Sequence, residues 1–379
     1  MRSGHAPTLT ATIPPVALLA TPPPAPAVVS PVAYEISFGR VIGRVGAGTM
    51  KVVVSVDGRV VARKDVGRTR FDFAVPLPAR DVRLTVTALD ERGRGASTTI
   101  GPVFSLPAAA EPRGPPRRSV EDPRLARTIR SLARAFPGIC GIYVQDLRTG
   151  AGAAWNAGAR FPAASTVKVA IAIEVLRRLG RKPPRGSRLD ALLRKAIIPS
   201  DDRAANDLLT WLGGSTSGGA ARVNQLFRAL GMDDTDMYGG YIVTQGQIPI
   251  RTGAQPSFVG KRTTAADLAT LMRSLNLAAV GQGALARRGF RPSQARFLLY
   301  LLAHSQVSRI DRFLPPGPTV VLQKAGWIST ALHDTGLVYW QGGSFVASVL
   351  TWNGRGVGVA SDVLAGRIGR AAYARFGRG

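Results

Sequence analysis

Hydrophobic and polar positions alternate along residues 33–106 in the way that short β-strands require. The stretch "MKVVVSVDGRVVARK" contains two alternating runs joined by Asp57 and Gly58, a strong hairpin signal. The runs "RFDFAVPL", "DVRLTVTAL" and "STTIGPVFSL" follow at the spacing of further strands. Six or seven short strands over roughly 74 residues predict a small all-β sandwich of immunoglobulin-like type.

From residue 122 the pattern changes to that of a mixed domain. "DPRLARTIRSLARAF" has its apolar residues on one helical face, and two strands follow around a turn in "GICGIYVQDLRTGAGAAWN". A helical block spans about 165–310, and the strands "TVVLQKAG", "HDTGLVYW" and "SFVASVLTW" come next, before a last helix at about 358–375. Strands from both ends of the segment, with helices between them, predict one antiparallel sheet packed by helices, which is an α+β fold.

Two segments lack either pattern. Residues 1–32 are rich in Pro, Ala and Thr, which predicts disorder or a degenerate secretory signal whose apolar patch is interrupted by prolines. Residues 107–121, "PAAAEPRGPPRRSVE", read as a linker. The sequence therefore predicts four segments: a disordered N-terminus or degenerate signal at 1–32, a β-sandwich at 33–106, a linker at 107–121 and the α+β domain at 122–379.

Charge and composition limit the classes of partner that the chain is expected to bind. The net charge of +27 indicates an anionic partner such as a nucleic acid, an anionic membrane or an anionic cell wall. The arginines are scattered, without a long basic run or interleaved aromatic residues, which argues against nucleic acid. No apolar run is long enough for a membrane span. The single cysteine, Cys140, excludes a disulfide within the chain and is expected to be a small core residue.

A lysine interrupts the apolar helix predicted in "FPAASTVKVAIAIEVL". Lys168 follows Ser165 by three residues, so both side chains lie on one helical face. A serine hydroxyl needs a base to become a nucleophile, and an amine in a dry, apolar setting has a lowered pKa and can be that base. The pair is a candidate nucleophile and base, although this motif alone is weak.

Two further stretches carry residues of matching chemistry. In "PSDDRAANDLL", Ser200 and Asp202 fall on a loop between two helices, where a second hydroxyl can relay a proton; the simpler alternative is that Asp201 or Asp202 only caps a helix. In "QKAGW", Lys324 comes at the end of a predicted strand beside a small Ala-Gly pair, where it can hold a substrate carboxylate. Each stretch taken alone is weak.

Taken together, the three stretches resemble a known family. S-x-x-K, then S-D-x, then K-x-G is the order found in serine β-lactamases and penicillin-binding proteins. Residues 122–379 resemble the class A β-lactamase-like serine hydrolases, through "AASTVKV", "SDDRAANDLL", "TTAADLATLM" and "KAGW…HDTGLVYW". The resemblance implies a secreted, cell-wall or periplasmic enzyme that acts on a small-molecule β-lactam or a peptidoglycan-derived substrate.

The resemblance also implies roles for individual residues. Ser165 would be the acylated nucleophile, Lys168 its general base, and Ser200 the relay of a proton to the departing nitrogen. The predicted substrate-binding residues are Asp202, Lys324, Gly326 and Trp327. Lys324 would hold the substrate carboxylate, and the backbone N–H groups of Ser165 and Trp327 would form the oxyanion hole. No cofactor is implied, and no metal site is expected because no His, Cys and carboxylate set has metal-binding spacing.

This chain departs from the family pattern at three positions. Asp202 stands where the family has an asparagine, and its charge would raise the pKa of Lys168. Ala325 replaces a threonine hydroxyl that helps to hold the carboxylate. The glutamate that activates the deacylating water is missing: counting from Thr235, its place falls near Tyr241, and residues 233–262 contain no glutamate. The hypothesis is therefore acylation with weak or altered deacylation.

Other classes of function remain open on the sequence. The departures favour a non-catalytic cell-wall or ligand-binding protein on the same scaffold, whereas the retained Ser165, Lys168, Ser200 and Lys324 argue against it. A peptidoglycan peptidase or an esterase would use the same acylation residues. If another group supplies the missing base, Asp236, Gln245 and Gln247 are the residues to consider.

Overall fold

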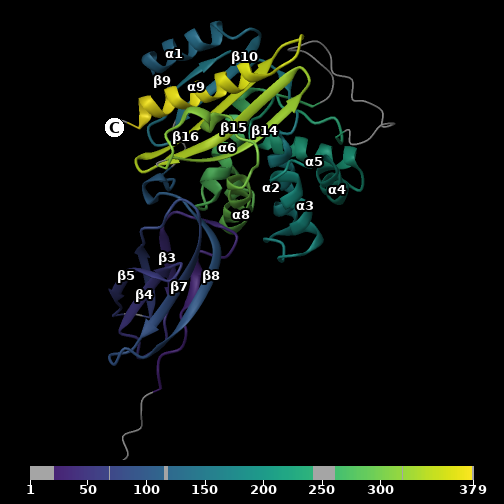
Figure 1. Cartoon of the computed structure of the whole chain (residues 1–379). Helices are drawn as coiled ribbons and strands as arrows, with labels where there is room; N and C mark the ends of the chain where they lie inside the picture. The colour runs from purple at the N-terminus through teal and green to yellow at the C-terminus, as the bar shows by residue number, and fades with distance from the viewer. Residues whose placement is uncertain (1–20, 68, 115–117, 242–260, 318, 378–379) are drawn as a thin grey trace, which may run out of the picture.

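The computed structural model describes residues 21–67, 69–114, 118–241, 261–317 and 319–377. Eight strands at the N-terminal end make two sheets (Figure 1). One sheet has the order β1-β3-β6, and the other has the order β2-β8-β7-β4-β5. The strands are β1 (Ala27–Ser30), β2 (Ile36–Ser37), β3 (Arg40–Arg44), β4 (Lys51–Val56), β5 (Arg59–Asp65), β6 (Arg70–Ala74), β7 (Asp81–Leu89) and β8 (Gly95–Ser105).

The two sheets share a hydrophobic core. Alternate residues of β3, β4, β6 and β7 point inward and form one buried cluster that includes Val41, Val52, Phe71 and Val86. The hairpin predicted around Asp57 and Gly58 is present as the β4–β5 pair. The immunoglobulin-like character of this module stays a prediction.

Strand β1 lies inside the segment for which disorder is predicted. It pairs antiparallel with β3, so the prediction of disorder is wrong for residues 27–30. The proline-rich composition hides this strand, because its four residues are too few to show an alternating pattern. The prediction of a degenerate signal concerns mainly residues 1–20, which lie outside the described residues.

The C-terminal part has a six-stranded sheet with helices on both faces, and the short strands β12 and β13 form a separate antiparallel pair. Its sheet has the order β14-β15-β16-β10-β11-β9, and all neighbours are antiparallel except β9, which is parallel to β11. The α+β fold predicted from the sequence is therefore confirmed. The strands of this part are β9 (Val120–Glu121), β10 (Ile139–Asp146), β11 (Ala151–Trp155), β12 (Phe161–Pro162), β13 (Arg262–Thr263), β14 (Val320–Ile328), β15 (Ala331–Trp340) and β16 (Gly343–Trp352).

Different helices cover the two faces of this sheet (Figure 1). α1 and α9 share one buried cluster with β10, β15 and β16, and α2, α6 and α8 belong to the cluster on the other face. The helices are α1 (Pro123–Arg134), α2 (Lys168–Leu179), α3 (Arg188–Ile197), α4 (Asp202–Gly213), α5 (Thr216–Ala229), α6 (Ala265–Ala278), α7 (Gly283–Arg287), α8 (Pro292–Ala303) and α9 (Val359–Phe376), with 3-10 turns η1 (Ala108–Ala110) and η2 (Ile310–Phe313). No helix among the described residues is long and apolar enough to cross a membrane.

The N-terminal sheets β1–β8, called the β-module below, pack directly on the helices α2, α6 and α8 of the C-terminal part. Ile36, Phe38 and Leu106 are buried in the same cluster as α2, α6 and α8. The carboxylate of Glu35, which is 1% exposed, forms ion pairs with Lys182 at 3.0 Å and Arg296 at 2.9 Å. The predicted linker boundaries, 107–121, stay a prediction, and the structure describes η1 and β9 within them.

Candidate active site

Ser165 lies in a tight turn that leads into α2. Helix α2 begins at Lys168, three residues after the predicted helix start. Before it, the Thr166 hydroxyl donates to the Ala163 carbonyl at 2.6 Å, and Ala164 has a φ of 47°, a left-handed conformation that is unusual for a residue with a Cβ atom. Such strain persists only where the surrounding structure imposes it, and it is frequent at active sites.

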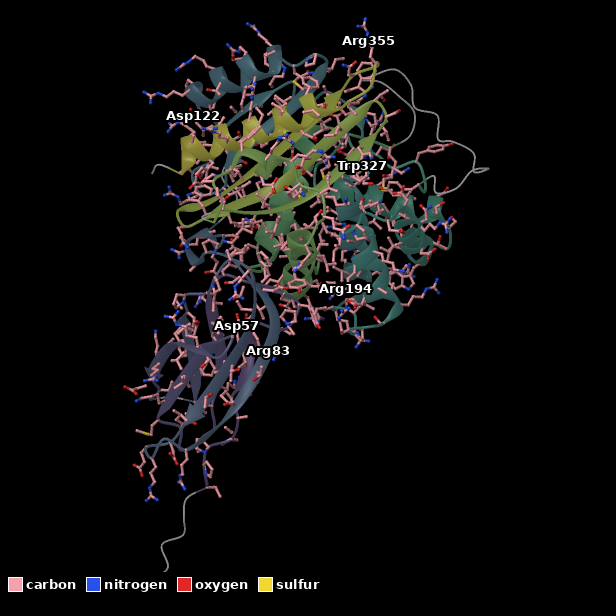
Figure 2. All side chains as sticks on the ribbon, viewed as in Figure 1. Asp57, Arg83, Asp122, Arg194, Trp327 and Arg355 are labelled. Carbon is pink, nitrogen blue, oxygen red and sulfur yellow. The ribbon has the colours of Figure 1, made fainter. Side chains whose placement is uncertain are left out.

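The end of β14 lies against this turn. A Cβ atom on Gly326 would come within 2.8 Å of the Ser165 amide nitrogen and 3.0 Å of the Thr166 amide nitrogen, so this position requires glycine. The next residue, Trp327, is 48% exposed, at the side of the molecule where β14 meets the helical block (Figure 2). The predicted association of Ser165 with the segment Lys324–Trp327 is therefore present in the fold.

Lys168 does not face solvent. Its side chain is buried on an apolar helix, and its ammonium donates to the Ser200 carbonyl, to the Ser200 hydroxyl at 3.3 Å and to the Asp202 carboxylate at 2.6 Å. Among the described residues, no hydrogen bond joins it to the Ser165 hydroxyl. Burial lowers the pKa of Lys168, and this effect is opposed by the charges of Asp202 and Asp201 and by the hydrogen bond that Lys168 donates to Asp202.

Ser200 lies between Lys168 and Lys324 and is hydrogen-bonded to both. It lies in the loop between α3 and α4 and has a φ of 66°. Its hydroxyl accepts hydrogen bonds from Lys324 at 2.8 Å and from Lys168 at 3.3 Å, so it connects the two lysines. The neighbouring Asp201 caps α4 by accepting from the Ala204 amide at 2.7 Å, whereas Asp202 points at Lys168. The capping alternative therefore applies to Asp201 alone.

Lys324 is buried inside a strand rather than at its end. β14 continues to Ile328, two residues beyond the end of the predicted strand "TVVLQKAG", so Lys324 lies inside the strand. Lys324 is 1% exposed, and burial together with the charge of Lys168 lowers its pKa to about 7. Its ammonium also donates to the Ala325 carbonyl at 2.9 Å. A cation that loses its proton near neutral pH can hold an anionic group and also influence proton transfer through Ser200.

Tyr241 occupies the place counted for the missing glutamate. Asn206 accepts from the Tyr241 amide at 2.6 Å and donates to the Tyr241 carbonyl at 2.8 Å, which fixes this backbone beside α4. The ring of Tyr241 lies 4.7 Å from the Lys168 ammonium, and its hydroxyl donates to the Ala164 carbonyl at 3.3 Å. Of the three alternative bases named from the sequence, Gln245 and Gln247 lie outside the described residues, and Asp236 pairs with Arg262 through the backbone.

Two cationic residues near the site were missed from the sequence. Lys261 is 9% exposed and lies 4.4 Å from the Tyr241 ring centroid. Arg309 pairs with Asp362 at 2.6 Å and lies over the exposed Trp327 ring at 5.8 Å. Its Nη1 atom is buried and donates to no partner among the described residues. Neither residue belongs to a short motif, so only the folded chain brings them to the site.

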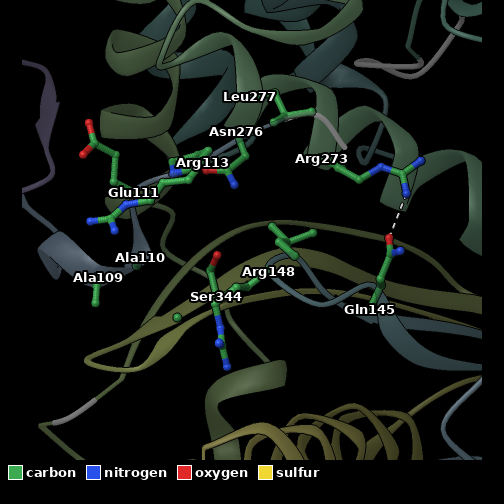
Figure 3. Close-up of a pocket in the computed structure, with 14 residues that line it drawn as sticks. Ala109, Ala110, Glu111, Arg113, Gln145, Arg148, Arg273, Asn276, Leu277 and Ser344 are labelled. Atoms are coloured by element: carbon green, nitrogen blue, oxygen red, sulfur yellow. Dashed lines mark hydrogen bonds between the residues drawn. The ribbon is translucent and has the colours of Figure 1, made fainter. Parts of the chain in front are cut away.

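A cavity of about 110 Å³ lies elsewhere, between residues 109–114, α6 and the turn after β10 (Figure 3). Arg148, Arg273 and Glu111 are among its lining residues, and none of the predicted catalytic residues borders it. The predicted catalytic residues therefore lie outside this cavity. No group of three or more His, Cys, Asp or Glu among the described residues could hold a metal ion.

Comparisons with known proteins identify the family and the fold of residues 124–376. The sequence model of the Beta-lactamase enzyme family matches residues 124–183 and 180–376. The structure of PBP-A is similar with a TM-score of 0.55 and 22% identity, covering 69% of this chain and 99% of that one. A class A beta-lactamase from Mycobacterium abscessus has a TM-score of 0.54 and 21% identity, covering 67% and 99%. The beta-lactamase from Sphaerobacter thermophilus has a TM-score of 0.51 and 23% identity, covering 67% and 97%. No curated protein matches the chain.

Proposed function

Because the chain belongs to the Beta-lactamase enzyme family, we propose that it is a serine hydrolase that β-lactams or related amides and esters acylate on Ser165. The observation that carries this proposal is the continuous set formed by Lys168, Ser200 and Lys324 beside the strained turn of Ser165. A PBP-A variant solved as an acyl-enzyme complex with penicillin G has the same fold, with a TM-score of 0.54 and 23% identity.

In the proposed acylation step, these groups would act as follows. Lys168, neutral after loss of its proton, takes the hydroxyl proton of Ser165 as the oxygen attacks the substrate carbonyl carbon. The amide C–N bond then breaks, and the departing nitrogen receives a proton that passes from Lys168 through the Ser200 hydroxyl. The Ser165 and Trp327 amides would stabilise the oxyanion, which Gly326 makes room for by its lack of a Cβ atom.

Substrate binding would use the cationic wall beyond Ser200. Lys324 would hold the substrate carboxylate, and the buried Nη1 of Arg309, without a partner among the described residues, would add a second donor. Asp202 would line the same site, although its carboxylate accepts from Lys168 at 2.6 Å and cannot donate to a substrate amide.

Deacylation would be slow because Tyr241 stands where the resemblance places the glutamate that activates the attacking water, and the Asp202 carboxylate is paired with Lys168. Tyr241, held by Asn206, is a poor base, since burial raises the pKa of its phenol well above the usual value and keeps it protonated. We therefore expect a long-lived acyl-enzyme. Members of the family are typically exported, so the enzyme would act outside the cytoplasm. The β-module would position the hydrolase domain there.

Mass spectrometry with a fluorescent penicillin tests this function. We expect wild-type protein to gain the mass of one penicillin on Ser165 and to keep it for much longer than a turnover time. The Ser165→Ala variant should not be labelled. Absence of labelling in wild type, or equal labelling of the variant, would favour a non-catalytic binding protein; fast turnover of nitrocefin would disprove slow deacylation.

A further inference from the structure

Lys261 ties together two segments that border the site. Its carbonyl accepts from the amide of Ala163, two residues before the nucleophile, at 2.9 Å. Its ammonium donates to the Gly240 carbonyl at 2.6 Å, immediately before Tyr241. One residue therefore fixes both the strand that leads to Ser165 and the backbone that carries Tyr241.

The ring of Tyr241 contacts two lysines. The ammonium of Lys261 lies 4.4 Å from the ring centroid and that of Lys168 lies 4.7 Å from it, both within the range of cation–π interactions. These distances place the two ammonium nitrogens within about 9 Å of each other. The side chain of Lys168 is fully buried and Lys261 is nearly so, which limits screening by solvent.

The carboxylates around Lys168 favour its protonated form, which cannot act as a base, and a second nearby cation would oppose this effect. Asp202 and Asp201 stabilise its protonated form, and Lys324 opposes it from β14. In the family an uncharged asparagine stands at the position of Asp202, so this chain has an additional negative charge beside its general base. The positive charge of Lys261, whose ammonium contacts the same Tyr241 ring, would offset that carboxylate.

We propose that Lys261 is a positioning residue of the acylation site: its ammonium offsets the charge of Asp202, so that Lys168 can work as a base, and it holds Tyr241 in place. This inference rests on the proposed function, because it assigns a role within the same reaction. Lys261 would not contact the substrate. Its loss should act through Lys168, and the effect should be reversed when the Asp202 charge is also removed.

The charge on Lys168 can be measured without any substrate. The chain has seven lysines, so the ¹³Cε signals of labelled lysine can be assigned by single substitutions and titrated by NMR. We expect Lys261→Met to raise the apparent pKa of Lys168 by about one unit, since that is the Coulomb effect of a charge near 9 Å at an effective dielectric constant of about 20. Asp202→Asn should lower this pKa, and the double variant should return close to wild type.

Matched variants separate charge from packing. Lys261→Arg keeps the charge, so the titration of Lys168 should remain close to wild type. Lys261→Gln removes the charge and can still donate to Gly240, so it should behave like Lys261→Met if charge is the cause. If Lys261→Met fails to fold, Lys261→Gln carries the test. An unchanged Lys168 titration in the folded, charge-free variant would overturn the proposal.

Acylation kinetics give the second readout. The rate of labelling by a fluorescent penicillin should reach its half-maximum about one pH unit higher in Lys261→Gln than in wild type, with Lys261→Arg unshifted. A rate that falls equally at every pH would indicate loss of structure and contradict the charge role. Failure of wild type to label would overturn the proposed function, whereas the NMR titration would still decide the role of Lys261.

Discussion

Tyr241 is the residue whose replacement would most directly change the reaction. Its backbone is held by Asn206 and its ring lies beside Lys168, so a carboxylate at this position would lie close to the acyl group. General-base catalysis typically contributes about 10²–10⁴-fold. We expect Tyr241→Glu to shorten the lifetime of the penicilloyl-enzyme by at least about 100-fold, measured by mass spectrometry after removal of free penicillin.

The control for this experiment is Tyr241→Gln. Glutamine has the same length as glutamate but cannot accept a proton at neutral pH. This variant therefore measures how much the removal of the tyrosine ring alone changes the release of the acyl group. If both variants release the acyl group at the same rate, water access rather than a missing base limits deacylation. Unchanged lifetimes in both would show that another group controls release.

Lys168 and Lys324 together predict how acylation depends on pH. Lys168 must lose its proton to act as a base, so the rate rises with pH at first. Lys324 must keep its proton to hold a substrate carboxylate, and its pKa is lowered to about 7, so kcat/KM for acylation should fall on the alkaline side. Stopped-flow labelling between pH 5 and about 9 measures both limbs.

Lys324→Arg provides the matched test of the alkaline limb. Arginine stays protonated throughout this range, so the alkaline fall should disappear in the variant even if its rate is lower. A wild-type rate that keeps rising to high pH, or an alkaline fall that persists in Lys324→Arg, would remove Lys324 from this role.

At the residue scale, the sequence motifs select residue types at fixed spacing. Ser165 lies in the turn before α2, which begins at Lys168, and Ser200 from a second motif accepts hydrogen bonds from Lys168 and from Lys324 of the third. The catalytic roles of these residues stay a prediction. Lys261 could not be found in this way. Its position depends on the two-residue pair β12–β13, which is too short to leave a pattern in the sequence.

At the scale of elements, β15 contains a histidine that should make stability sensitive to acid. His333 is fully buried; its Nε2–H donates to the Pro162 carbonyl at 2.7 Å and its Nδ1 accepts from the Thr351 amide at 3.2 Å. This arrangement requires the neutral ring, and burial lowers the pKa of His333 to about 4. The stabilisation is present above about pH 6.5 and is lost as pH falls from there toward 4.

Comparison with His333→Gln isolates this effect. Between pH 7.5 and about 5, wild type should lose roughly 2 kcal/mol more unfolding free energy than the variant, as measured by urea denaturation. The neighbouring Asp334, whose pKa burial raises to about 6, acts in the opposite direction, but it is present in both proteins and cancels. An equal pH dependence of the two proteins would show that His333 does not titrate in this range.

The long elements were predictable and the short ones were not. α1, α9 and β14–β16 follow clear patterns because each has nine or more residues, the helices with one buried face and β15 and β16 with both faces buried. β1, β9, β12 and β13 have two to four residues, and neighbouring strands rather than their own sequence determine their conformation. The helix start at Lys168 was also missed, because the strained turn at Ala164 interrupts an otherwise continuous apolar run.

At the scale of the whole molecule, the β-module and the larger part share one core. Ile36 and Phe38 from the module are buried together with α2 and α8, and Tyr300 and His304 at the end of α8 contact Asp81 of β7. The sequence indicated a module joined by a linker, because alternation and composition describe each segment separately. The contact surface depends on which side chains meet after folding, and no local pattern encodes it.

Glu35 provides the strongest test of this joint core. Its buried carboxylate pairs with Lys182 before α3 and with Arg296 on α8, so it links the module to two separate parts of the helical block. Removing one partner from a buried ion pair typically costs about 3–5 kcal/mol, and the partial exposure of both cations favours the lower end of this range. We expect Glu35→Ala to lower the unfolding free energy by about 3 kcal/mol in urea denaturation.

Glu91 is the matched control, because it is an exposed glutamate of the same module. Surface substitutions of this kind usually change stability by no more than about 0.5 kcal/mol, so Glu91→Ala should unfold like wild type. If the module and the hydrolase domain unfold together, Glu35→Ala should shift a single transition, observed equally by circular dichroism and by penicillin labelling. Two separate transitions, with penicillin labelling of Glu35→Ala lost at the same urea concentration as in wild type, would show that the module contacts the hydrolase domain without stabilising it.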